Sequence, residues 1–142
     1  MCERHGEKET SQMFDEVLFS RDIDSFLSDN AMQFAHMDLP GYLGACLEML
    51  HATKREVIAR SQLSQIYGYH IFSGYRRPQR DKLLQLAFGF PLNVEQTQRL
   101  LRCGGYHGLY ARDRRDSVLL FCLSKGVCVL DTEEMLIRMG LE

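Results

Sequence analysis

The chain of 142 residues lacks several features that would place it in a common class of protein. It has no run of about 18 consecutive apolar residues, so we expect no membrane-spanning helix. Its first twelve residues are polar and acidic, unlike a secretory signal, so we expect a cytoplasmic protein.

Motifs for catalysis and for metal binding are also missing. No GxSxG, HExxH, P-loop or dinucleotide-binding sequence is present, so we do not expect an enzyme. The five cysteines form no CxxC pair, and we expect neither a bound metal nor a cofactor. Four of them lie among apolar neighbours, which predicts buried, reduced thiols. These are Cys46, Cys103, Cys122 and Cys128.

What the chain does have is an uneven distribution of charge. Residues 1–38 carry three basic and nine acidic residues, whereas residues 54–80 carry six basic residues and one acidic residue. Within the second segment, residues 61–78 (SQLSQIYGYHIFSGYRRP) contain no acidic residue. A local basic segment in a chain of net charge −2 is typical of proteins that bind nucleic-acid phosphates. A solvated helix face would show the same charge.

The spacing of apolar residues predicts an all-α protein with an N-terminal arm, residues 1–38. Residues 1 to about 20 are only weakly periodic, and we expect a partly disordered segment there. Residues 20–34 then predict a short amphipathic helix. The arm is followed by a five-helix domain, residues 39–104, and by a C-terminal helical extension, residues 105–142.

Local capping signals define the helices of the central domain. The apolar stripe from Leu43 to Leu50 predicts the first helix, with Pro40 in or near its first turn. Thr53, Ser64 and Asn93 are suitable N-cap residues for later helices. The remaining four helices are predicted over residues 54–61, 65–72, 79–88 and 93–104.

Residues 117–130 are compatible with either a β-hairpin or a pair of helices. We favour helices because Gly126 is a good C-cap residue. Asp131 and Glu134 form a possible capping box for the last helix. The run from Val118 to Leu123 is more apolar than one small core needs, so we expect a homodimer surface here. Burial within the monomer would explain that run nearly as well.

A cluster of charged residues precedes this apolar run. Arg112, Arg114 and Arg115 alternate with Asp113 and Asp116. We interpret the cluster as a surface segment that compensates its own charge, in preference to a second nucleic-acid site.

Residues 53–78 resemble a known motif. The pattern formed by Ile58, Gln62-Leu63-Ser64, Gly68, Ile71 and Gly74 has the spacing of the helix-turn-helix in Cro/repressor-type (xenobiotic-response-element) transcription regulators. The order of five helices over about 65 residues is similar too. The resemblance implies a λ-repressor-like five-helix fold and a sequence-specific regulator that binds double-stranded DNA, as a dimer on a two-fold site.

The resemblance also implies roles for individual residues. Positions that contact bases in the family are occupied here by Gln65, Ile66, Tyr69 and His70. Positions suited to phosphate contacts are occupied by Lys54, Arg55, Ser64, Tyr75, Arg76, Arg77 and Arg80. Gln65 would pair with adenine and Ile66 with a thymine methyl group, while the phosphate contacts would supply affinity.

Two residues of the motif differ from the family. Gln62 stands at the turn where the family usually has glycine, so we expect a left-handed backbone conformation there. Gly68 stands at a core position that usually carries a side chain, and we expect Tyr67 or Phe72 to fill the gap. We also expect Tyr67, Ile71 and Phe72 to face the core.

Two other hypotheses remain open. One is that the chain keeps this fold as a protein-interaction module without DNA binding, since the predicted recognition helix has no lysine or arginine. The other is that the acidic arm covers the basic segment and competes with DNA. Deleting residues 1–38 would then tighten DNA binding, and an unchanged affinity would exclude this idea.

Overall fold

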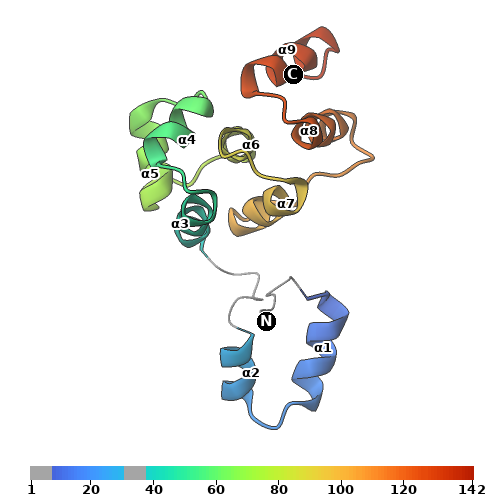
Figure 1. Ribbon diagram of the computed structural model, residues 1–142. Coiled ribbons are helices and arrows are strands. Elements are labelled where there is room, and N and C mark those ends of the chain that lie inside the picture. The colour runs from blue at the N-terminus through green and yellow to red at the C-terminus, as the bar shows by residue number, and fades with distance from the viewer. Residues whose placement is uncertain (1–7, 31–37) are drawn as a thin grey trace. The chain divides into compact units, whose positions relative to one another are not determined.

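The computed structural model describes residues 8–30 and 38–142, which belong to two separate units (Figure 1). Every regular element in these two ranges is a helix, so the prediction of an all-α protein is confirmed for them. No helix within the described ranges is long and apolar enough to cross a membrane.

The N-terminal unit contains α1 (Thr10–Phe19) and α2 (Ile23–Asp29). Lys8 links the two ends of this segment, because its ammonium group lies 2.9 Å from Glu16 and 2.7 Å from Asn30. The prediction of disorder up to about residue 20 is therefore wrong for α1. The helix predicted over 20–34 begins three residues later, and its predicted end lies outside the described residues.

The second unit contains seven helices among its described residues, which begin at residue 38. They are α3 (Leu39–Leu50), α4 (Lys54–Arg60), α5 (Gln65–Ser73), α6 (Arg80–Gly89), α7 (Val94–Cys103), α8 (Arg114–Lys125) and α9 (Val129–Arg138). Thr53, Ser64 and Asn93 each accept a hydrogen bond from a backbone amide in the first turn, as their capping role predicts.

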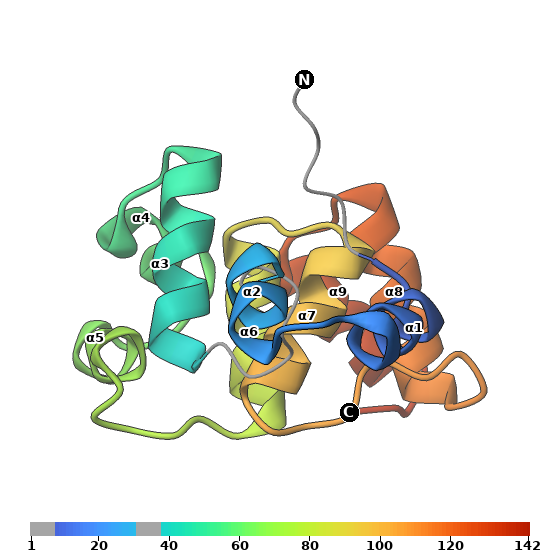
Figure 2. The same cartoon turned by 90° about the horizontal axis from the view of Figure 1, so that it is seen from below.

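Helices α6 and α7 form the middle of this unit (Figures 1 and 2). On one side they pack against α3 and α4, and on the other against α8 and α9. The Tyr42 hydroxyl of α3 donates to the Gln96 carbonyl of α7 over 3.1 Å. Leu83 and Leu86 of α6 and Leu100 of α7 are completely buried. Helix α4 packs against α6, and α5 packs against α3 and α4.

The C-terminal residues continue the same core. Leu119 and Leu123 of α8 and Leu136 of α9 belong to the apolar cluster that α3–α7 build. Helices α8 and α9, in the predicted C-terminal extension of residues 105–142, belong to the same compact unit as α3–α7.

The secondary structure after residue 113 supports helices in place of a hairpin. Helices α8 and α9 are joined through Gly126, whose φ of 71° gives the predicted left-handed C-cap. The predicted capping box at Asp131 is wrong, because α9 already begins at Val129 and its N-cap is Cys128. Burial of the Val129 side chain, which is 4 % exposed, favours this earlier start.

The cysteines are less uniformly buried than the sequence predicts. Cys46 and Cys122 are buried, Cys103 is half-buried and Cys128, at the N-cap of α9, is exposed. Burial raises the pKa of the Cys46 thiol to about 11, so it is protonated at neutral pH. Cys2 lies outside the described residues.

Candidate nucleic-acid interface

The candidate interface is built on the short pair α4–α5 and the turn between its helices. Thr53 and Glu56 form a reciprocal capping box at the start of α4, and the Ser64 hydroxyl accepts from the Tyr67 amide at the start of α5. Between the helices, Gln62 has a φ of 61°, as the expected left-handed turn requires. The turn is also closed by a hydrogen bond of 3.4 Å from the Leu63 amide to the Ile58 carbonyl.

Gly68 sets the close approach of α5 to α4. A methyl group added at Gly68 would lie 2.6–2.8 Å from three side-chain carbons of Ile58. Ile58 is itself 2 % exposed. The expectation that Tyr67 or Phe72 fills a gap at Gly68 is therefore wrong, because the Ile58 side chain already occupies that space.

Helix α5 has one face in the core and one face in solvent. Ile71 and Phe72 are buried and Tyr67 is half-buried against the core, as predicted. On the opposite face, Ile66 is 73 % exposed and Tyr69 is 37 % exposed.

Gln65, at the first position of α5, is also exposed. His70 is half-buried and packs against Tyr75, with 4.7 Å between the ring centroids and an angle of 57° between the ring planes. Tyr75 remains 77 % exposed. Of the four predicted base-contacting residues, Gln65, Ile66 and Tyr69 are thus exposed, whereas His70 is engaged by a neighbouring ring.

The predicted phosphate-contacting cations fall into two groups. Lys54, Arg55 and Arg76 are exposed, and none of them forms an ion pair with another described residue. Arg77 is exposed but donates to the Gly104 carbonyl over 3.2 Å and lies 5.7 Å from the centre of the Tyr106 ring.

Arg80 has partners inside the protein, and its assignment as a phosphate ligand needs correction. Two of its nitrogens donate to the two carboxylate oxygens of Asp116 at 3.2 and 3.0 Å. The guanidinium also donates to the His107 and Gly108 carbonyls. With four hydrogen bonds committed in this way, Arg80 joins α6 to the start of α8 and is not available to DNA.

Asp116 is the buried partner in this ion pair. Burial alone would raise the pKa of Asp116, but hydrogen bonds from Arg80 and from the Tyr110 amide outweigh it and lower that pKa. The charged cluster from Arg112 to Asp116 is therefore not self-compensated as predicted. Arg115 also pairs outside it, with Asp81 of α6 at 3.1 Å.

Two polar side chains fasten the α4–α5 pair to α6, and the sequence patterns did not indicate either of them. Arg60 donates to the Gly89 and Phe90 carbonyls at the end of α6. Gln85 of α6 donates to the Ser61 carbonyl, at the end of α4, over 3.0 Å. The partners are 24 to 30 residues apart, so no local signal relates them.

Within the described ranges, no group of three or more histidine, cysteine, aspartate or glutamate residues is arranged to hold a metal ion. The chain matches no protein-family model, curated protein or solved structure.

Proposed function

We propose that α4 and α5 form a helix-turn-helix that binds double-stranded DNA, and that the chain is a sequence-specific transcription regulator. The observation that carries the proposal is the outward face of α5. That face exposes Gln65, Ile66 and Tyr69, and no carboxylate occurs between Ser61 and Arg80.

The dimensions of α5 suit the major groove of DNA. Nine helical residues are about 13 Å long, and a helix of roughly 10–12 Å in diameter fits a groove about 12 Å wide. Gln65 at the first position would reach an adenine edge, and Ile66 a thymine methyl group. Lys54, Arg55 and Arg76 would then contact phosphates, together with Arg77 where its hydrogen bond to Gly104 allows.

A homodimer on a two-fold site belongs to the same proposal. Helices α8 and α9 expose apolar side chains, which would supply the surface between two copies. The exposed residues are Phe121 (52 %), Leu130 (57 %) and Ile137 (58 %).

A direct test separates base contacts from phosphate contacts. The full chain is titrated into DNA from upstream of its own gene and into an unrelated duplex. Gln65→Ala should reduce the preference for the specific duplex by about 1–3 kcal/mol. Arg76→Ala should weaken both complexes alike, while Arg138→Ala on α9 serves as the matched loss of charge. Binding to neither duplex at low salt would exclude the proposal.

A protein-interaction module is the second candidate, and one observation favours it. Helix α5 contains no lysine or arginine, and its most exposed apolar residue is Ile66. Recovery of one stoichiometric protein partner that is lost with Tyr69→Ala or His70→Ala, in a chain without DNA affinity, would favour this function over the first.

A further inference from the structure

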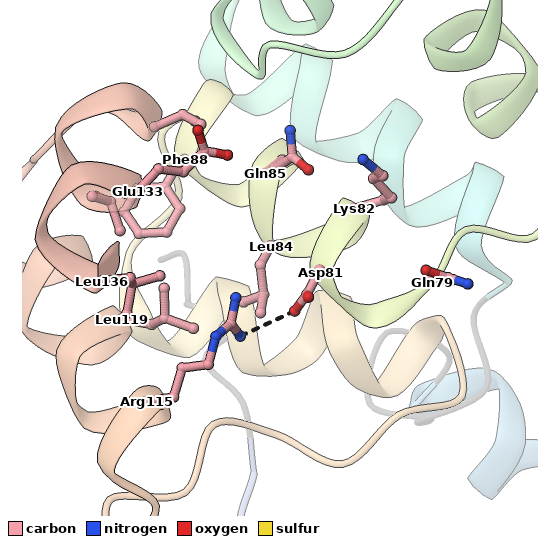
Figure 3. Close-up of a pocket in the computed structure, with 12 residues that line it drawn as sticks. Gln79, Asp81, Lys82, Leu84, Gln85, Phe88, Arg115, Leu119, Glu133 and Leu136 are labelled. Carbon is pink, nitrogen blue, oxygen red and sulfur yellow. Dashed lines mark hydrogen bonds and ion pairs between the residues drawn. The ribbon is translucent and has the colours of Figure 1, made fainter. Parts of the chain in front are cut away.

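A pocket of about 270 Å³ lies between α6, α8 and α9, away from the outward face of α5 (Figure 3). Helix α6 and its N-cap residue Gln79 supply half of its lining, and α8 and α9 supply the rest. The residues that line it are Gln79, Asp81, Lys82, Leu84, Gln85, Phe88, Arg115, Leu119, Val129, Thr132, Glu133 and Leu136. Sites for drug-sized ligands usually measure about 300–1,000 Å³, so this pocket suits a smaller molecule.

The pocket has an apolar part formed by all three helices. Leu84 of α6, Leu119 of α8 and Leu136 of α9 line it and are 3–4 % exposed. The half-buried Phe88 also lines the pocket (Figure 3). An aliphatic or aromatic group placed against these side chains would leave water, which favours binding by about 25 cal/mol for each Å² buried.

Two basic and two acidic side chains line the pocket, and one residue of each kind forms an ion pair with the other. Arg115 and Asp81 form an ion pair of 3.1 Å at the edge (Figure 3). Lys82 of α6 and Glu133 of α9 remain, and neither forms an ion pair with any residue that the structure describes. Among the described residues, Lys82 and Glu133 are thus the charged groups of the pocket that have no ion-pair partner, and they add to its apolar part.

Thr132 adds a polar group without a partner. The residue is 3 % exposed and lines the pocket, and its hydroxyl oxygen forms no hydrogen bond with the described residues. An unsatisfied buried hydroxyl typically costs about 1–3 kcal/mol. A ligand with a polar head group beside Thr132 would remove part of that cost after a rotation of the side chain.

We propose that this pocket binds a small zwitterion with an apolar side chain, namely a free apolar α-amino acid. The carboxylate of the ligand pairs with Lys82 and its ammonium group with Glu133. Its side chain packs against Leu119 and Leu136. A simple anion or a simple cation would leave either Glu133 or Lys82 unpaired. A ligand with one positive and one negative group pairs with both side chains.

In the test, L-leucine is titrated into the full chain in a calorimeter. DNA is left out, so the result does not depend on the proposed DNA binding. Saturable binding is expected. Three analogues should each bind at least about tenfold more weakly, because each lacks one recognised group. They are 4-methylpentanoate, without the ammonium group, 3-methylbutylamine, without the carboxylate, and glycine, without the side chain.

Paired variants locate the binding. Glu133→Gln and Lys82→Gln should each weaken leucine binding about tenfold. Glu134→Gln should leave it unchanged, because Glu134 is exposed on the same helix but does not line the pocket. Circular dichroism checks that each variant is folded. The proposal is overturned by no saturable binding, by an analogue that binds as tightly as leucine, or by variants that bind leucine like the unaltered chain.

Discussion

Gly68 is the residue that determines how closely α5 approaches α4. The position of Gly68 in the motif could be predicted from spacing. The need for a glycine there could not, because it arises from a contact with Ile58 on the preceding helix. An alanine there would bring its methyl group to 2.6 Å from Cγ2 of Ile58, which is shorter than any tolerated contact. The helices would have to separate, and the outward face of α5 would move.

Gly68→Ala should therefore lower the free energy of unfolding by about 1–3 kcal/mol, the usual cost of overpacking a core. Truncating Ile58 removes all three clashing carbons, so the double variant Ile58→Ala/Gly68→Ala should be less destabilised than the sum of the two single variants. Urea unfolding followed by circular dichroism gives the four values. Additive effects would show that the two side chains do not compete for one space.

Gln62 carries the left-handed turn at the cost of backbone strain. A residue with a Cβ atom in this conformation is disfavoured by roughly 1–2 kcal/mol relative to its right-handed conformation. Glycine avoids that strain but loses more entropy on folding. We expect Gln62→Gly to raise the free energy of unfolding by about 0.5–1 kcal/mol, measured in the same unfolding experiment. Gln62→Ala keeps the strain and should give no increase, so a similar gain in both variants would contradict this account.

At the scale of the elements, the ion pair between Arg80 and Asp116 holds α6 to the start of α8. The side chains are 20 % and 6 % exposed, so this is a largely buried pair. Arg80→Met would leave the Asp116 carboxylate buried without its partner, and we expect a loss of about 3–5 kcal/mol at neutral pH. The control is Arg115→Met, whose pair with Asp81 is more exposed and should contribute no more than about 1 kcal/mol.

Acidification provides an independent check on the same pair. Because the pKa of Asp116 is lowered in the folded chain, its contribution to stability is complete above the unfolded value, which is about 3.9. The contribution is lost as the pH falls through the lower folded value. The difference in unfolding free energy between the unaltered chain and Arg80→Met should therefore shrink below about pH 4. A difference that stays constant would show that Asp116 is not the origin of the loss.

The elements also show which parts of the fold a sequence can predict. Thr53, Ser64 and Asn93 mark helix starts through hydrogen bonds to amides three residues away, so these starts were predicted correctly. Asp131 has the same local signal, but α9 begins earlier in the sequence, at Val129, because the Val129 side chain is buried. Arg80 was misassigned because its partner lies 36 residues further along the chain. Helix capping by nearby residues can be predicted from the sequence, whereas partners that are distant in the sequence cannot.

At the scale of the whole molecule, positive and negative charges are concentrated in different segments of the sequence. The segment 54–80 is basic within a chain of net charge −2, but three of its six cations, Arg60, Arg77 and Arg80, bind carbonyl or carboxylate groups of the protein itself. Lys54, Arg55 and Arg76 remain exposed. The DNA-binding proposal therefore depends on few phosphate contacts per copy of the chain, and this number can be measured.

The dependence of DNA affinity on salt tests the central proposal most directly. Each phosphate contact contributes about −0.9 to the slope of log affinity against log salt. Three cations in each of two copies predict a slope of roughly −5 for the unaltered dimer, reduced by about 2 in the Arg76→Ala variant. A flat slope, or the same slope in both proteins, would contradict the assignment of these residues to a DNA interface.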